Sequence, residues 1–226
     1  KSRNLNFFDA TCPLVTKVHM EVRKHAKASK DIILVGHEGH PEVEGTMGRH
    51  INSDNSSIYL VQNELDAKNI KINNPTKLAL VTQTTLSVDE TKSIIDILKY
   101  RFPDIDIPKK DDICYATQNR QDAVKQLALE SDFMIVVGSK NSSNSNRLSE
   151  LAEKCGCRSI LIDEFTDIDL DDLKNYSKIS ITAGASAPES KVMEIAKSLE
   201  LHADAEIIEH GEDNEDIYFK LPPGLR

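Results

Sequence analysis

The chain has 226 residues, with 39% hydrophobic and 29% charged residues, which suits one or two globular domains and excludes a disordered chain. Its formal charge of −9 disfavours a general nucleic-acid or membrane-surface binder, and 6 Phe, 5 Tyr and no Trp leave little surface for stacking on bases. No apolar run approaches the length of a membrane span.

Short apolar runs along the chain predict β-strands that are buried on both faces. They comprise residues 31–35, 77–81, 133–137, 159–162 and 178–181. Helical patterns with one apolar face lie between them, over residues 14–26, 88–102 and 192–199. This alternation is typical of an α/β fold with parallel sheets. Because such sheets bind ligands at the carboxyl ends of their strands, the polar residues that follow each run are site candidates.

The strongest organisational feature is an internal repeat. Cys12 opens one predicted helix and Cys114 opens another, 102 positions later. A strand that ends at Gly36 runs into a polar loop, and a strand that ends at Gly138 does the same, again 102 positions later. A third strand runs into a polar loop at 82–87, and its counterpart follows 100 positions later. Three landmarks in the same order indicate a duplication.

The repeat predicts two homologous α/β units, residues 1–108 and 109–204, followed by a C-terminal arm or hairpin over 205–226. Helix starts favour the thiolate form of Cys. We therefore expect Cys12 and Cys114 to face each other and to provide half of a metal or cluster site. Two buried structural thiols are the alternative. A disulfide is disfavoured, because 4 Cys without framework spacing suggest a reducing compartment.

Cys155 and Cys157 resemble a ligand pair, but they lie between a predicted helix and a strand. Gly156 between them suits a helix cap, and the other repeat has no matching pair. We interpret both as structural thiols and keep a chemical role as the lesser alternative.

The loop after the first strand carries His37, His40, Pro41 and Glu42. Two His and one carboxylate could bind zinc, although the spacing differs from that of a helical zinc pair. The loop could also be a polar turn with a capping His. In a third interpretation His40 binds an anion and Glu42 is a proton donor or base. Pro41 suits the first helical position, so the helix N-terminus should point towards whatever His40 contacts.

Two further loops, residues 139–147 and 182–189, are rich in small polar residues. Either could be a flexible linker, but each follows a buried strand and precedes a helix. Ser and Asn caps with free backbone N–H groups form an anion cradle, so these loops suit a diphosphate. No Walker or dinucleotide-binding glycine pattern is present.

The loop at 82–87 combines a polar strand end with the start of a helix. Ser87 and Glu90 fit a capping box. Gln83, Thr84 and Thr85 are then expected to remain free to face the site.

Six strings in order resemble the LytB family, the 4-hydroxy-3-methylbut-2-enyl diphosphate reductases of the non-mevalonate isoprenoid pathway. They are residues 9–15, 36–46, 82–87, 112–117, 138–147 and 182–188. The resemblance spans nearly the whole chain. It implies pseudo-equivalent α/β domains with parallel sheets, three of which form a trefoil around a central [4Fe-4S] cluster, each giving one Cys.

The resemblance also implies roles for individual residues. Cys12 and Cys114 match two of the cluster ligands. Glu42 matches the proton-delivering acid, Thr84 a residue near the substrate hydroxyl, and His40 the His of the site. The residues that match the diphosphate-binding set are Ser142, Ser143, Asn144 and Ser186, together with His40.

The activity implied is reductive dehydroxylation, which yields isopentenyl and dimethylallyl diphosphate, with ferredoxin or flavodoxin as electron donor. A cytoplasmic or plastid-stromal setting is expected, without nucleic-acid or membrane partners. The chain begins at Lys1 and shows two units where the family has three. We therefore expect a partial sequence that lacks the first cluster Cys and two His, with impaired activity.

Two other functions remain open at this point. One is a non-catalytic remnant that keeps the fold and binds diphosphate. The other is a zinc-dependent hydrolase that uses Cys12, Cys114, His37 and His40.

Overall fold

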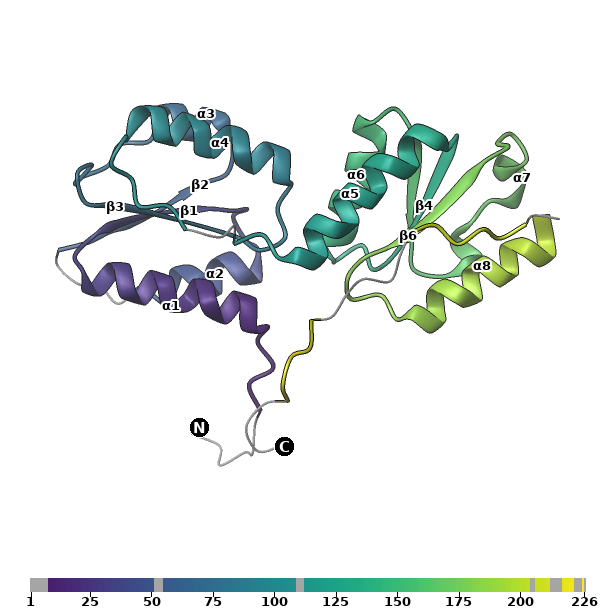
Figure 1. Ribbon diagram of the computed structural model, residues 1–226, viewed down its shortest axis with the longest axis horizontal. Coiled ribbons are helices and arrows are strands. Elements are labelled where there is room, and N and C mark those ends of the chain that lie inside the picture. The colour runs from purple at the N-terminus through teal and green to yellow at the C-terminus, as the bar shows by residue number, and fades with distance from the viewer. Residues whose placement is uncertain are drawn as a thin grey trace. The chain divides into compact units, whose positions relative to one another are not determined.

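The computed structural model describes residues 8–50, 55–108, 112–203, 206–211, 217–221 and 225. The described residues form two compact units (Figure 1). The first contains the chain up to Thr84 and residues 96–112, and the second contains residues 85–95 and most of the chain after Ile113. The expected boundaries at 108/109 and 204/205 fall beside residues 109–111 and 204–205, which lie outside the described residues.

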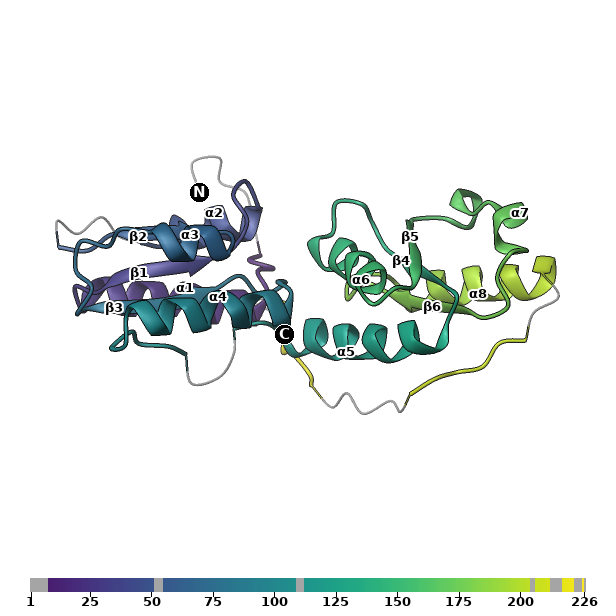
Figure 2. The same ribbon diagram turned by 90° about the horizontal axis from the view of Figure 1, so that it is seen from above.

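The first unit is a parallel three-stranded sheet covered by helices on both faces. Its strands, β1 (Asp31–Val35), β2 (Ile58–Val61) and β3 (Leu78–Thr82), lie in the order β2-β1-β3. One face carries α1 (Pro13–Lys27) and α2 (Pro41–Met47), and the other carries α3 (Glu64–Asn69) and α4 (Val88–Arg101) (Figures 1 and 2). Of α4, the part from Asp96 onward is counted in this unit, and its start is counted in the second. Every residue of β1 and β3 is buried, as their continuous apolar character predicts.

The core under α1 and α2 shows why this unit folds as it does. Val18 and Val22 of α1 lie one helical turn apart and pack with Val43 of α2 against Ile32 and Leu34 of β1. The chain after α4 lies along the outer edge of β3, where Asp106 accepts a backbone hydrogen bond from Leu80 at 2.9 Å and donates one to Leu78 at 2.9 Å.

The second unit repeats the same plan. Its strands, β4 (Phe133–Val137), β5 (Arg158–Ile162) and β6 (Ile179–Ala183), are parallel and lie in the order β5-β4-β6. One face is covered by α5 (Tyr115–Glu130) and α6 (Ser143–Lys154). The other is covered by α7 (Leu170–Leu173) and α8 (Glu189–Ala203), and the short 3-10 helix η1 (Phe165–Asp167) precedes α7. Alternate residues of β4 pack in opposite directions, with Met134 and Val136 under α5 and α6 and Phe133 and Ile135 towards α8.

The predicted α/β class with parallel sheets is confirmed, and so are all five predicted strands, to within one or two residues. The equal strand order of the two units confirms the repeat. Sequence patterns missed β2, because it is a short edge strand that is only partly buried. The described residues 206–211 and 217–221 form neither helix nor strand, so they hold no hairpin. No helix in the described part of the chain is long and apolar enough to cross a membrane.

The third landmark of the repeat needs a correction. Val35 of β1 pairs with Thr82 of β3, and Val137 of β4 pairs with Ala183 of β6. Since Val35 and Val137 are equivalent, Thr82 corresponds to Ala183, an offset of 101 (183 − 82) rather than the expected 100. In this register Thr84 of the first unit corresponds to Ala185 of the second.

Candidate functional site

Two free thiols stand at equivalent helix starts. Cys12 is the N-cap residue of α1 and is exposed. Cys114 is the N-cap of α5, where its Sγ accepts the Thr117 N–H at 3.3 Å and lies 3.0 Å from the Thr117 hydroxyl. The alternative of two buried structural thiols is wrong, because neither Cys is buried. Both are free rather than disulfide-bonded.

The donor chemistry of these two residues fits an iron–sulfur cluster. Such clusters are held by Cys thiolates. The reduction potential of a cluster is tuned by N–H···S hydrogen bonds to these sulfurs, and Cys114 accepts one from Thr117. Among the described residues no three His, Cys, Asp or Glu side chains are grouped to hold a metal ion. Cys12 and Cys114 therefore offer the right atoms but only part of a ligand set. Cys12, His37 and His40 of the first unit likewise form no zinc site.

His40 caps the helix that follows β1. Its Nδ1 accepts the Glu42 N–H at 3.2 Å, which confirms the capping interpretation of this loop. Because Nδ1 is an acceptor, the proton of the neutral ring lies on Nε2, and that N–H remains available as a donor. Burial lowers the pKa of His40 and favours this neutral form.

Glu42 and Thr84 form a close pair inside the first unit. The Glu42 carboxyl group lies in the first turn of α2 and accepts the Thr84 N–H at 2.7 Å and the Thr84 hydroxyl at 3.1 Å. Burial raises the pKa of Glu42, the two bonds from Thr84 oppose this shift, and the charge of Asp112 raises the pKa further. A carboxyl group whose pKa is raised in this way retains its proton to higher pH than an exposed Glu.

The sequence did not predict that Asp112 contributes to this site. Its side chain is fully buried, and its carboxylate accepts the Thr82 N–H at 3.1 Å and the Lys17 ammonium at 3.1 Å. It therefore fixes the end of β3 and raises the pKa of Glu42. Its place two residues before Cys114 gave no signal for either role.

Gln83 is buried and not free to face a ligand, so that expectation is wrong for this residue. Gln83 is 1% exposed, and its Oε1 accepts the His37 N–H at 3.2 Å, which ties the loop after β1 to the end of β3. Thr85 donates from its hydroxyl to Ser143 at 3.4 Å. Ser87 accepts the Glu90 N–H at 3.4 Å as predicted, but the Glu90 carboxylate forms ion pairs with Lys154 and Arg147.

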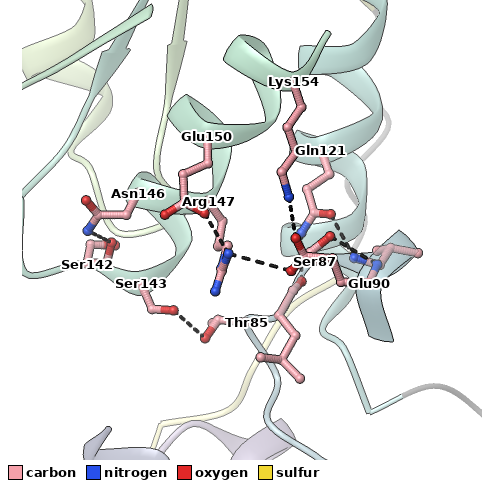
Figure 3. Close-up of polar contacts among 12 residues, drawn as sticks. Thr85, Ser87, Glu90, Gln121, Ser142, Ser143, Asn146, Arg147, Glu150 and Lys154 are labelled. Atoms are coloured by element: carbon pink, nitrogen blue, oxygen red, sulfur yellow. Dashed lines mark hydrogen bonds and ion pairs between the residues drawn. The ribbon is translucent and has the colours of Figure 1, made fainter. Parts of the chain in front are cut away.

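The predicted anion-binding residues of the second unit gather in the first turn of α6. Ser142 is its N-cap residue and accepts the Ser145 N–H at 3.3 Å. Ser143 accepts from Thr85 (Figure 3). Asn144 is 5% exposed, yet neither polar atom of its side chain has a hydrogen-bond partner. A buried amide without partners is costly, which points to a ligand group as its partner.

Ser186 lies in the exposed loop that follows β6. Since β6 is parallel to β4 and paired with it, this loop and the start of α6 lie at the same end of the sheet. Ser145 fills the space between Gly138 and Gly184: a Cβ at either glycine would lie 2.3 Å and 2.1 Å, respectively, from the Ser145 Oγ. The two glycines therefore allow α6 to approach both strand ends. Sequence analysis had missed Ser145 and Gly184 as structural parts of this site.

Cys155 and Cys157 lie away from these loops, at the end of α6 and the start of β5. Cys157 is buried in the core with Leu148 and Val136, and burial raises the pKa of its thiol. Gly156 has a φ of +85°, as expected for a glycine that ends a helix. These observations support the structural interpretation of both thiols.

Comparison with known proteins identifies the family. The family model described as LytB protein matches residues 1–200. The 4-hydroxy-3-methylbut-2-enyl diphosphate reductase of Saccharophagus degradans is 55% identical over 99% of the chain, which spans 72% of that relative.

Two solved structures agree with this match. The E-1-hydroxy-2-methyl-but-2-enyl-4-diphosphate reductase from Plasmodium falciparum superposes with a TM-score of 0.87 at 36% identity, covering 95% of this chain and 67% of that one. A second, (E)-4-hydroxy-3-methyl-but-2-enyl diphosphate reductase, the terminal enzyme of the non-mevalonate pathway, gives a TM-score of 0.52 at 28% identity and covers 85% of this chain and 66% of that one. The chain therefore belongs to the LytB family.

Proposed function

We propose that this chain acts as a 4-hydroxy-3-methylbut-2-enyl diphosphate reductase in the non-mevalonate pathway. The names of its relatives support this substrate. The observation that carries the proposal is the half-buried Glu42–Thr84 pair, which holds a carboxyl group of raised pKa at the carboxyl end of a parallel sheet. The overall reaction breaks one allylic C–O bond, consumes two electrons and two protons, and releases water.

Cys12 and Cys114 are the residues that we propose as ligands of a [4Fe-4S] cluster. When bound, such a cluster supplies one-electron transfer and a Lewis-acidic iron. Both are N-cap residues of helices, at equivalent positions of the two units. Two thiolates are fewer than such a cluster usually has. We therefore propose that the 226 residues alone hold it weakly and have impaired activity.

Glu42 is proposed to deliver the proton with which the hydroxyl group leaves as water. Because its pKa is raised, Glu42 keeps this proton to higher pH than an exposed Glu would. The Thr84 N–H and hydroxyl fix the carboxyl group on two sides, so its free oxygen lone pairs point in defined directions. The Thr84 hydroxyl donates to Glu42, and its oxygen is proposed to accept a hydrogen bond from the substrate hydroxyl.

The diphosphate is proposed to bind through neutral donors. Ser142 and Ser143 already accept a hydrogen bond each, so their own protons are left to donate. The Asn144 amide has no partner within the protein, and Ser186 adds an exposed hydroxyl. The α6 N-terminus adds backbone N–H groups and the positive end of the helix dipole. His40 contributes Nε2–H in the first unit.

The proposed partners follow from the reaction. The substrate is a small allylic diphosphate, and a ferredoxin or flavodoxin supplies the electrons one at a time. We propose a cytoplasmic location, or the plastid stroma in a eukaryote.

The proposal is tested by anaerobic reconstitution of the protein with iron and sulfide, followed by reduction of the substrate with a chemical one-electron donor. We expect bound iron, the visible absorption of thiolate-bound clusters, and both isopentenyl and dimethylallyl diphosphate as products. C12S and C114S should lose iron, whereas C155S should keep it. Failure of the wild-type protein to form either product would refute the proposed activity, and unchanged iron in C12S and C114S would refute the ligand assignment.

A further inference from the structure

A buried glutamine of α5 meets the chain just before and at the start of α4. Gln121 is 2% exposed, and its Nε2 donates to the Leu86 carbonyl at 2.8 Å. Its Oε1 accepts the Val88 N–H at 3.0 Å (Figure 3). One side-chain amide thus bonds to the backbone on both sides of Ser87, as a neighbouring strand would.

These two bonds satisfy groups that the local fold leaves without partners. Val88 is the first residue of α4, so its N–H has no acceptor within the helix. Gln121 and Leu86 are both buried, and an unpaired polar group there would be costly. Gln121 therefore holds the loop through two hydrogen bonds, one to a backbone carbonyl and one from a backbone N–H.

The same loop carries residues of the proposed site. Leu86 follows Thr84, which bonds to Glu42, and Thr85, which donates to Ser143 in the first turn of α6. Only one peptide unit separates Thr85 from the carbonyl that Gln121 holds. A shift of this loop would move both threonines, and displacements of about 1 Å at such groups can reduce a rate by about 100-fold.

We propose that Gln121 is a positioning residue that fixes the Thr84–Thr85 segment for the reduction. This inference rests on the proposed function. Gln121 touches no reacting group, and it acts through the backbone of Leu86 and Val88.

Ion pairs at the start of α4 also restrain this segment, but more weakly. Asp89 pairs with Lys125 at 2.8 Å, and Glu90 pairs with Arg147 and Lys154. The Asp89 and Glu90 side chains are 65% and 45% exposed, and ion pairs of such exposure contribute little. The buried amide of Gln121 therefore restrains this loop more than these ion pairs do.

The test compares Q121M, which keeps the volume but removes both bonds, with Q126M, the same change at an exposed position of the same helix. Hydrogen exchange of the Val88 amide should become about 10-fold faster or more in Q121M and stay unchanged in Q126M. The kcat per iron-loaded folded protein should fall about 10-fold or more in Q121M with a smaller change in KM. Equal exchange and equal kcat in the two variants would overturn the proposal.

A double-mutant cycle separates positioning from a general loss of structure. If Gln121 acts through Thr84, Q121M should reduce kcat much less in a T84A background than in the wild type. Equal factors in both backgrounds would overturn the proposal. Should Q121M not fold, Q121E keeps the acceptor for Val88 and loses the donor to Leu86, and the same measurements apply. A wild-type protein without reductase activity would refute the proposed function, and hydrogen exchange would still decide whether Gln121 holds the loop.

Discussion

The two units carry different chemistry at equivalent positions of one scaffold. Glu42 and Asn144 both occupy the second position of the helix that follows the central strand, 102 residues apart. In the first unit the strand end provides Thr84, which satisfies the Glu42 carboxyl group. In the second unit its counterpart is Ala185, which has no hydroxyl, and the Asn144 amide has no partner. The first unit thus satisfies its polar side chain internally, whereas the second leaves the Asn144 amide without a partner from the protein.

A second pair of positions shows the same contrast. Gln83 follows β3 and closes the loop after β1 by accepting the His37 N–H. Its counterpart in the second unit is Gly184, whose missing side chain makes room for Ser145. In the first unit, side chains at the end of β3 therefore hold the loop after β1 and the Glu42 carboxyl group in place. In the second unit, the missing side chain of Gly184 lets the first turn of α6 approach the strand end.

The largest expected effect comes from removing the acid. Glu42→Gln keeps the shape and the bond from the Thr84 N–H but removes the titratable proton. We expect kcat to fall on the order of 10²-fold or more while the iron content stays unchanged. Glu44→Gln, an exposed neighbour on the same helix, is the matched control and should retain full turnover. Near-normal turnover of the Glu42 variant would remove this residue from the mechanism.

The equivalent change in the second unit should act on binding instead. Asn144→Asp replaces an unpaired donor with a carboxylate of the same size. We expect KM for the diphosphate substrate to rise about 10- to 100-fold with a smaller change in kcat, since a ground-state contact is lost and a repulsion gained. Steady-state kinetics over a wide substrate range checks this. A drop in kcat at unchanged KM would contradict the assignment of Asn144 to substrate binding.

The glycines at the ends of the central strands should be similarly sensitive in both units. A Cβ at Gly138 would approach the Ser145 Oγ to 2.3 Å, and one at Gly36 would approach Val43 Cγ2 to 2.6 Å. We expect Gly138→Ala and Gly36→Ala to reduce the free energy of unfolding by about 1–3 kcal/mol each. Chemical denaturation measures both values. Ser145→Gly should restore stability to Gly138→Ala but not to Gly36→Ala, and rescue of both would contradict the contacts.

The smallest expected effect is a pH dependence of stability that arises from Glu42. Burial raises the pKa of this group above its unfolded value of 4.5, so the folded state binds the proton more tightly. The stability that results is fully present below the unfolded pKa and is lost as pH rises through the folded pKa. The melting temperature of Glu42→Gln should therefore improve relative to the wild type as pH rises. A constant difference across this range would show that the pKa of Glu42 is not raised.

The sequence was sufficient for much of the fold, because buried parallel strands such as 31–35 and 133–137 are continuous apolar runs. The repeat then located the equivalent helix starts at Cys12 and Cys114. Partners of buried polar groups were harder to foresee. Gln83 looked free, and its bond to the His37 N–H depends on how β1 and β3 pair, which is a tertiary property. The position equivalent to Thr84 likewise became clear only from strand register.

The outer edge of β3 has a consequence for how the protein behaves at high concentration. An uncovered strand edge offers unpaired N–H and C=O groups to any extended segment of another molecule. Here Asp106 already uses the Leu80 N–H and the Leu78 carbonyl, and its own side chain is paired with Lys30 at 2.7 Å. The Asp106 carboxylate therefore lies where a strand of another molecule would have to pair with β3. This edge of the sheet is protected against intermolecular β-pairing and the aggregation that follows from it.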